Sequence, residues 1–246
     1  MFSDADATSR KRSGGRNISM EDYIGKKNRV APRTAAIDEE ILASQHAYIS
    51  AKRVFDTVGS AIGLILLSPL FLVLAIIIKL DDPAGPVFFS QLRIGKDGRE
   101  FRMYKFRSMC VDAEAKLAKL IKQNEVEGAM FKIKDDPRIT RIGRFIRKTS
   151  LDELPQLYNV LRGDMSLVGP RPCLPREYKD YSSYDKQRVL VLPGCTGLWQ
   201  VSGRNSLSFD QMVDLDLEYI SNRSVLNDLI ILFRTVKIVI IPNQAY

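Results

Sequence analysis

Two adjacent carboxylates, Asp152 and Glu153, lie in the segment of the chain that offers the most chemistry. Arg147 and Lys148 precede them, and Pro155 follows in the first turn of an expected helix, where its missing N–H would be unpaired anyway. Cationic side chains and the free N–H groups at a helix start favour an ionised carboxylate and also attract phosphate. The pattern therefore indicates attack by a carboxylate on phosphorus, which forms an acyl phosphate.

A second segment holds Arg171 between two prolines, Pro170 and Pro172. Both rings fix φ, and Pro172 also restricts Arg171, so the guanidinium is carried on a stiff loop that suits two-point contact with phosphate. Each motif has a structural alternative that the sequence leaves open. Ser150 and Glu153 have the spacing of a helix capping box, and the proline-flanked loop is also compatible with a surface turn whose arginine is solvated.

A third segment, residues 193–205, is rich in glycine and contains the only tryptophan, Trp199. An indole in such a loop is suited to stacking on a nucleotide base or to lying at a membrane interface. Plain packing inside the domain is the structural alternative.

The element that must position these groups relative to a substrate is an apolar segment, residues 54–80. It is long enough to enter a bilayer, but Ser68 and Pro69 interrupt it at its centre. Basic residues flank it on both sides, and because such residues stay cytoplasmic, a re-entrant helix that turns back satisfies both flanks. Pro69 supplies the bend, and Ser68 can bond a freed carbonyl. A single-pass helix with a mild kink is the alternative.

The composition restricts the class of protein. The chain has 246 residues, enough for one domain and a tail, and its net charge of +8 favours an anionic partner: nucleic acid, anionic lipid or a phosphorylated substrate. Three cysteines without metal-ligand spacing indicate a reducing compartment, and a single histidine disfavours a hydrolase with a histidine base. No secretory signal is expected, because the apolar run starts late and no cleavage site follows it.

The fold class that we expect is α/β (α+β-like): a small cytoplasmic domain with an N-terminal re-entrant membrane helix and interfacial amphipathic helices. Residues 1–50 are predicted to be a basic, disordered tail with a short helix near 38–50, which either contacts anionic lipid or is merely solvated. Residues 51–80 form the re-entrant helix and residues 81–246 the catalytic domain. Strands are expected at 87–91 and 101–106, joined by a turn at Asp97-Gly98, and helices at 112–123, 136–148, 154–161, 209–220 and 226–241. The last helix is predicted to lie in the membrane interface, with a buried core helix as the alternative.

Taken together, these segments resemble the bacterial sugar transferase family, the monotopic polyprenyl-phosphate phosphoglycosyl transferases. The resemblance runs from about Lys52 to Ile241 and rests on five motifs in order: residues 105–109 (KFRSM), 136–138 (DPR), 147–156 (RKTSLDELPQ), 163–172 (GDMSLVGPRP) and 197–205 (GLWQVSGRN). Larger members carry additional transmembrane helices upstream, so the chain looks like the small form, or the exopolysaccharide-initiating galactose/glucose type.

The resemblance implies transfer of a sugar-1-phosphate from a UDP-sugar to undecaprenyl phosphate with release of UMP, at the bacterial inner membrane and as the first membrane step of surface glycan synthesis. It implies that Asp152 is the nucleophile and that Glu153 belongs to a Mg²⁺ site, where the ion neutralises charge as UMP leaves. Phosphate contacts are then expected from Arg147, Lys148 and Arg171. Weaker expectations of substrate contact fall on Asp216 and Asn205.

Two other classes of protein remain open. A membrane-anchored nucleic-acid-binding protein would also be basic, but it calls for aromatic and basic residues interleaved on one face, and the basic stripe 138–148 has only Phe145. We therefore expect no nucleic acid among the partners. A non-enzymatic scaffold of polysaccharide assembly would not need the Asp152–Glu153 pair. The sequence names neither the sugar nor the oligomeric state, a homo-oligomer included.

Overall fold

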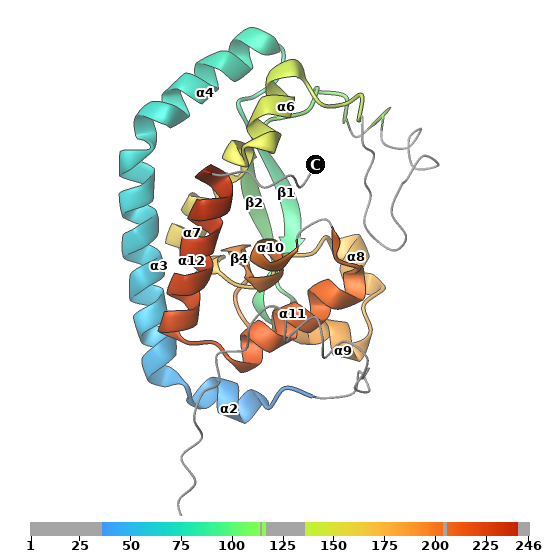
Figure 1. The fold of residues 1–246 in the computed structure, drawn as a ribbon. Coiled ribbons are helices and arrows are strands. Elements are labelled where there is room, and N and C mark those ends of the chain that lie inside the picture. The colour runs from blue at the N-terminus through green and yellow to red at the C-terminus, as the bar shows by residue number, and fades with distance from the viewer. Residues whose placement is uncertain (1–35, 114, 117–135, 204–205, 241–246) are drawn as a thin grey trace, which may run out of the picture. The chain divides into compact units, whose positions relative to one another are not determined.

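The computed structural model describes residues 36–113, 115, 116, 136–203 and 206–240. The chain divides into two units after Ala35, and every described residue belongs to the second unit, Ala36–Tyr246. This unit combines helices with two small sheets (Figure 1), which agrees with the expected mixed α and β class.

The elements up to residue 153 are α2 (Glu39–Ser44), α3 (His46–Leu66), α4 (Ser68–Asp81), β1 (Phe88–Ile94), the 3-10 turn η2 (Lys96–Gly98), β2 (Glu100–Phe106), α6 (Arg141–Lys148) and the 3-10 turn η4 (Leu151–Glu153). The later elements are α7 (Gln156–Arg162), β3 (Ser166–Val168), α8 (Pro175–Lys179), α9 (Ser183–Lys186), η5 (Gln187–Leu190), β4 (Gly194–Thr196), α10 (Leu198–Ser202), α11 (Phe209–Ser221) and α12 (Val225–Ile240).

The predicted hairpin is confirmed. β1 and β2 pair antiparallel, with Phe88 opposite Phe106 at one end and Ile94 opposite Glu100 at the other. Asp97 lies at the turn with a φ of 56°, a left-handed conformation that aspartate tolerates better than most residues. The second sheet is a parallel pair, in which Ser166 of β3 lies opposite Gly194 of β4.

The helix predicted over 136–148 is wrong at its start, because α6 begins only at Arg141. Before it, the Asp136 carboxylate accepts hydrogen bonds from the backbone N–H and the guanidinium of Arg138, which closes a turn. Such side-chain bonds to nearby backbone compete with a helix. Thr140 then starts α6 by accepting the N–H of Gly143 at its Oγ1, 2.9 Å away.

The other predicted helices are placed as follows. The segments 154–161, 209–220 and 226–241 become α7, α11 and α12, and Gly163 ends α7 with a φ of 91°. The short helix expected near 38–50 is confirmed as α2, with Asp38 as its cap, although α3 already begins at His46, ahead of the expected boundary at residue 51. Most of the helix expected at 112–123 lies outside the described residues.

Ser68 and Pro69 do interrupt the apolar segment. The axes of α3 and α4 differ by 59° at this point. Pro69 has no N–H to give to the carbonyl of Ile65, and the Ser68 hydroxyl donates to that same carbonyl over 2.8 Å. Among the described helices, none alone is long and apolar enough to cross a membrane, whereas the bent pair α3–α4 passes that test together on length and composition.

The helix α3 packs on the domain through polar side chains. The Arg53 guanidinium donates to the carbonyls of Val160 and Leu161 at the end of α7, and Asp56 Oδ1 accepts the N–H of Leu167 in β3. The opposite side of the helix is apolar and uncovered, with Val54, Val58, Ile62, Ile65 and Leu66 between 51 and 72 % exposed. This arrangement is the reverse of an ordinary surface helix, which buries its apolar side.

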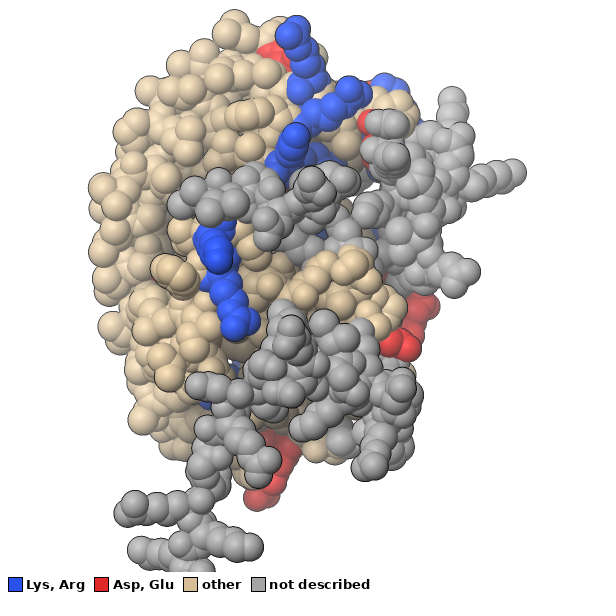
Figure 2. Space-filling model, in the orientation of Figure 1, with Lys and Arg blue, Asp and Glu red and all other residues tan. Residues whose placement is uncertain are grey.

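The neighbouring helices continue this uncovered apolar surface. On α4, Leu74 and Ile78 pack against Phe106, whereas Leu72, Ile76 and Leu80 are exposed. On α12, which lies beside α3 (Figure 1), Leu226, Phe233 and Val236 are exposed, so this helix is not the buried core helix that the sequence left open. The surface over α3 and α4 carries almost no charged side chain in the view of Figure 2.

Candidate active site

The Asp152–Glu153 pair lies on η4, in the short connection between α6 and α7. Ser150, just before it, has a φ of 57° and its hydroxyl makes no capping hydrogen bond. The capping-box alternative is therefore wrong. The Glu153 carboxylate instead receives Lys105 from β2, with 2.6 Å between Lys105 Nζ and Glu153 Oε1.

Asn159 is the residue that holds η4 and α7 against β2, a role that no sequence pattern indicates. Its side chain is fully buried. Its Oδ1 accepts the N–H of Tyr104 at 3.0 Å, and its Nδ2 donates to the carbonyl of Arg102 at 2.7 Å. These bonds fix β2 on either side of Met103, just ahead of Lys105, which reaches Glu153. The position of Lys105 in the family motif KFRSM was the one sequence signal for a role at the site.

Arg171 approaches the same carboxylate from the loop after β3. Its Nη1 lies 3.7 Å from Glu153 Oε1, and its side chain is 38 % exposed, which leaves it accessible to a ligand. The loop is held at the β3–β4 pair, where the N–H of Gly194 donates to the carbonyl of Pro170 over 2.8 Å. Glycine is required there, because a Cβ at Gly194 would lie 2.0 Å from the backbone nitrogen of Gly169.

The basic end of α6 supplies further positive charge (Figure 2). Arg147 and Lys148 occupy its last turn and are exposed. The charge of Arg147 lowers the pKa of Asp152, so the structure brings Arg147 to the pair that the sequence associated with it. Lys148 is not among the groups that act on either carboxylate in the described part of the chain, and its phosphate contact stays a prediction.

The two carboxylates have opposite electrostatic environments. Asp152 is only 8 % exposed, and burial raises its pKa from 3.8 to about 6, with Glu153 adding to the rise while Lys105 and Arg147 oppose it. Burial acts on Glu153 in the same direction, but Lys105, Arg171 and Arg93 outweigh it and lower the pKa to about 2. The expectation of a strongly ionised carboxylate thus holds for Glu153 and not for Asp152.

One oxygen of Glu153 is available to a cation in the described part of the chain. Both cationic contacts of Glu153 fall on Oε1, and within the described residues nothing donates to its Oε2. No group of three or more His, Cys, Asp or Glu side chains in the described part of the chain could hold a metal ion. Mg²⁺ commonly takes one or two carboxylates together with water and substrate phosphates. Glu153 therefore fits such an ion only in company with a diphosphate.

Two expected substrate-binding residues lie elsewhere. Asp216 is fully buried on α11, where its Oδ2 accepts Nε of Arg188 over 2.8 Å. The prediction that it contacts substrate finds no support in this placement. Asn205 lies outside the described residues. Trp199 is buried on α10, which favours the packing role that the sequence left open.

Two other motif residues serve the structure rather than the pair. Arg138 is buried and forms its ion pair with Asp136, at 2.5 Å between Nη2 and Oδ2. Arg107 is buried as well, and it binds the side chain and the carbonyl of Asp82 at the end of α4. Both arginines tie loops around α6 and β2 in place.

These features define a small α/β domain with an uncovered apolar helix pair and a carboxylate pair ringed by cations. The model of the bacterial sugar transferase family matches residues 47–242, and the chain belongs to this family.

Similar proteins were found in several bacteria. The chain is 50 % identical over 235 residues to galactosyl transferase CpsE of Streptococcus agalactiae (93 % of this chain, 52 % of the relative) and 47 % identical over 199 residues to undecaprenyl-phosphate galactose phosphotransferase of Salmonella typhimurium (79 % and 41 %). It is 42 % identical over 200 residues to exopolysaccharide production protein ExoY of Rhizobium meliloti (80 % and 88 %). The chain thus spans about half the length of the first two relatives and most of ExoY.

The raised pKa of Asp152 predicts a gain in stability on neutralisation. Between pH 3.8 and about 6 the folded protein binds a proton that the unfolded chain has lost, so the folded state loses stability as pH rises through this window. In metal-free buffer near pH 8, Asp152→Asn should therefore increase the free energy of unfolding by up to roughly 3 kcal/mol. The melting temperature should rise accordingly. The difference should shrink as pH falls toward about 4.

Thermal unfolding of the detergent-solubilised protein across this pH range measures the effect. Asp180→Asn, at an exposed aspartate on the end of α8, is the matched control and should show no such pH-dependent gain. A wild-type protein that is more stable than Asp152→Asn near pH 8 would contradict the prediction.

The placement of Arg171 predicts that its geometry matters more than its charge. Arg171→Lys keeps the charge but cannot make a planar two-point contact, and we expect it to lose about 2 kcal/mol of transition-state stabilisation, roughly 30-fold in kcat/KM. The melting temperature should barely move, because a partly exposed charge contributes little to folding. Turnover assays and thermal unfolding check this, with Arg176→Lys on α8 as the control. Near-normal turnover of Arg171→Lys, or its unfolding, would indicate instead that the proline-flanked loop has a structural role.

Proposed function

We propose that this protein transfers a sugar-1-phosphate from a UDP-sugar to undecaprenyl phosphate and releases UMP, as the first membrane step in the synthesis of an exopolysaccharide or another surface glycan. The observation that carries the proposal is the buried Asp152 carboxylate, next to Glu153 and within the field of Lys105 and Arg147. The relatives named for galactose transfer to lipid carriers support it, and UDP-galactose and UDP-glucose are the leading donors. A panel of UDP-sugars would decide between them.

Asp152 is proposed as the nucleophile. Apart from the backbone N–H of Asp152 itself, no described group donates a hydrogen bond to its carboxylate, so lone pairs are available for attack. A pKa of about 6 makes this carboxylate more basic than an exposed aspartate, and it is still ionised at neutral pH. The carboxylate oxygen attacks the phosphorus that bears the sugar. The bond from this phosphorus to the bridging oxygen breaks, and UMP leaves with the electron pair.

The second step regenerates the carboxylate. A phosphate oxygen of undecaprenyl phosphate attacks the same phosphorus, the bond to Asp152 breaks, and the product is a polyprenyl diphosphate that carries the sugar. Arg171 and Lys105 are assigned to stabilise the charge on the diphosphate, an assignment supported by their shared contact with Glu153. A Mg²⁺ ion held by Glu153 and the diphosphate would neutralise charge on the leaving group.

The uncovered apolar surface supports a place at the inner membrane. We propose that α3 and α4 enter the bilayer as a re-entrant helix pair and return to the cytoplasmic face, and that α12 lies in the interface with its Arg234 and Lys237 reaching toward anionic headgroups. The acceptor can then keep its chain in lipid while its phosphate reaches Asp152. Extracting that chain would cost about 0.8 kcal/mol for each methylene.

The rival classes have less support. A nucleic-acid-binding surface uses aromatic rings as stacking platforms beside its cations. On α6, Phe145 is the single aromatic ring exposed beside the basic side chains. A non-enzymatic scaffold would need neither a buried carboxylate nor the cations around it. Release of UMP from a UDP-sugar by the purified protein, with and without undecaprenyl phosphate, separates all three classes.

Asp152→Asn should abolish turnover, because an amide is a poor nucleophile and cannot form the acyl phosphate. Wild-type protein incubated with UDP-sugar and Mg²⁺, but without acceptor, should gain the mass of a phosphosugar on Asp152, as intact-protein and peptide mass spectrometry will show. Asp152→Asn should gain none. Glu153→Gln should retain the fold and lose most activity, with a weaker dependence on Mg²⁺. Substantial activity of Asp152→Asn would refute the nucleophile assignment.

Both ends of the bent helix pair should lie on the same face of the membrane. Ser50 is exposed near the start of α3, ahead of the apolar segment 54–80, and Ala84 is exposed just after α4. Cysteines introduced at either site, in a variant without the native cysteines, should resist a membrane-impermeant thiol reagent in intact cells and react after permeabilisation. Labelling of one site alone in intact cells would instead indicate a spanning helix.

Replacing Ser68 and Pro69 together with leucine should change this topology. Leucine restores the missing N–H and removes the ring, so α3 and α4 can join into one straight apolar helix long enough to span. The two cysteine sites should then differ in accessibility. Val73→Leu, on the exposed side of α4, is the control and should leave both sites protected.

A further inference from the structure

Arg93 is a buried cation to which the motifs gave no role. It lies near the end of β1, its side chain is 8 % exposed, and two of its nitrogens have defined acceptors. Nη1 donates to the carbonyl of Pro172 at 3.0 Å, and Nη2 donates to Oε1 of Gln91 at 2.7 Å. Its Nε is buried and has no hydrogen-bond partner in the described part of the chain. The guanidinium therefore joins β1 to the loop that carries Arg171.

The two prolines limit how the loop backbone can be fixed. Pro170 and Pro172 have no N–H to donate, so at these two residues the backbone is held through its carbonyls. Just after them, the N–H of Ile94 in β1 donates to the carbonyl of Cys173 over 2.9 Å. Gly194 holds the carbonyl of Pro170, and Arg93 holds that of Pro172, so the two contacts bracket Arg171.

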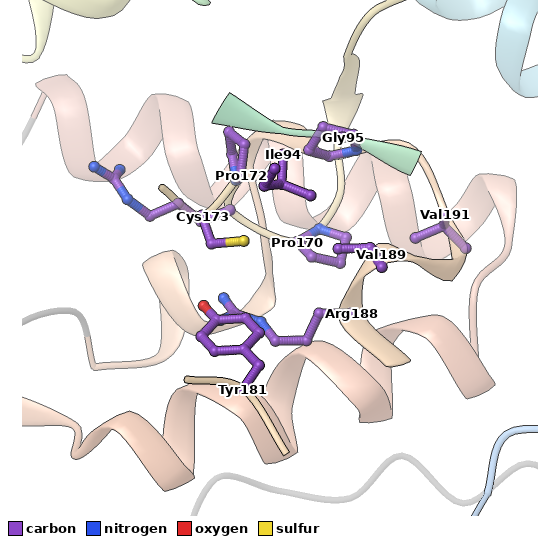
Figure 3. A pocket seen from close by; sticks show the side chains of 11 residues that line it. Ile94, Gly95, Pro170, Pro172, Cys173, Tyr181, Arg188, Val189 and Val191 are labelled. Carbon is purple, nitrogen blue, oxygen red and sulfur yellow. The ribbon is translucent and has the colours of Figure 1, made fainter. Parts of the chain in front are cut away.

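A small cavity lies on the inner side of the loop, lined by residues that include Ile94, Pro170, Pro172 and Arg188 (Figure 3). Its volume is about 10 Å³, roughly the space of one water. Side chains leave this space beside Pro170 and Pro172, so the hydrogen bond from Arg93 to the Pro172 carbonyl adds support where packing is incomplete.

The charge of Arg93 reaches the carboxylate pair as well. It contributes to the low pKa of Glu153, and the charge of Arg171 in turn helps burial to lower the pKa of Arg93 to about 10. The two cations therefore repel each other, and Arg171 is the more exposed of the two. Burying a charge between two neutral acceptors is expensive, and a neutral donor could make the same bonds at a lower desolvation cost.

We propose that Arg93 is a positioning residue for Arg171. It fixes the backbone on the C-terminal side of Arg171 through Pro172, and its positive charge directs the Arg171 guanidinium outward, to Glu153 and the diphosphate of the donor. Arg93 touches neither Glu153 nor substrate. This inference rests on the proposed role of Arg171 in binding the diphosphate.

A double-mutant cycle tests the inference. Arg93→Met, Arg171→Ala and the double variant are compared with wild type by kcat/KM for UMP release from the UDP-sugar. Since Arg93 acts through Arg171, Arg93→Met should cost roughly 30-fold in the wild-type background and less than about 3-fold when Arg171 is already alanine. Arg102→Met is the matched control: it makes the same substitution at an exposed position of β2, and kcat/KM should stay unchanged in both backgrounds.

Each outcome bears on one hypothesis. If Arg171→Ala retains wild-type activity, the proposed function of Arg171 fails, and the role of Arg93 fails with it. If Arg171→Ala is impaired but the two effects multiply, or if Arg93→Met is as active as wild type, only the role of Arg93 is overturned. A merely structural effect would lower the melting temperature and multiply with the loss caused by Arg171→Ala.

Arg93→Lys keeps the test decisive if Arg93→Met does not fold. Lysine retains the charge, but a single ammonium on a shorter reach does not hold both Pro172 and Gln91. The same pattern is expected in the cycle, with a smaller loss in the wild-type background because the repulsion of Arg171 remains. Full activity of Arg93→Lys would overturn the positioning role of the two-point contact.

Discussion

The docking of α3 through its polar side is the constraint on which the rest of the structure depends. Arg53 binds the carbonyls that end α7, and Asp56 binds the backbone of β3. Because α7 follows η4 directly and β3 leads into the Arg171 loop, one helix fixes both halves of the site. Its apolar side stays uncovered, so the same contacts also set where this exposed apolar surface lies relative to the carboxylate pair.

The site separates two neighbouring carboxylates by their surroundings. Lys105 and Arg171 both contact Glu153 through Oε1, which keeps this group ionised and leaves Oε2 without a donor among the described residues. Asp152, one residue earlier, is buried, and this burial outweighs the charges of Lys105 and Arg147, so its pKa rises toward neutrality. Adjacent residues thus differ in how readily they lose a proton, which suits them to the different tasks proposed for them. The fold achieves it by bringing β2 and the proline-flanked loop to the same residue.

The elements with strong local signals could be predicted, and those that depend on distant contacts could not. The hairpin turn at Asp97-Gly98, the end of α7 at Gly163 and the break at Ser68-Pro69 are local effects of backbone chemistry, and all three are found. The start of α6 was misplaced, because Asp136 pairs with Arg138 instead of entering the helix. The roles of Asn159 and Arg93 could not be predicted from the sequence. Their partners lie far along the chain, on β2 for Asn159 and on the loop after β3 for Arg93.

The sequence by itself determined the chemistry of this protein: a carboxylate pair, flanking cations, a stiff arginine loop and a broken apolar segment are all written in residue types and spacing. Only the tertiary structure decided which partner each of these groups contacts and how deeply each is buried. Glu153 forms an ion pair with Lys105 instead of a capping box with Ser150, because tertiary packing brings β2 to η4. Whether Asp216 would face substrate or the buried Arg188 depends on how α11 packs. Hydrogen bonds and burial between distant segments settle such choices, and a local pattern carries no record of them.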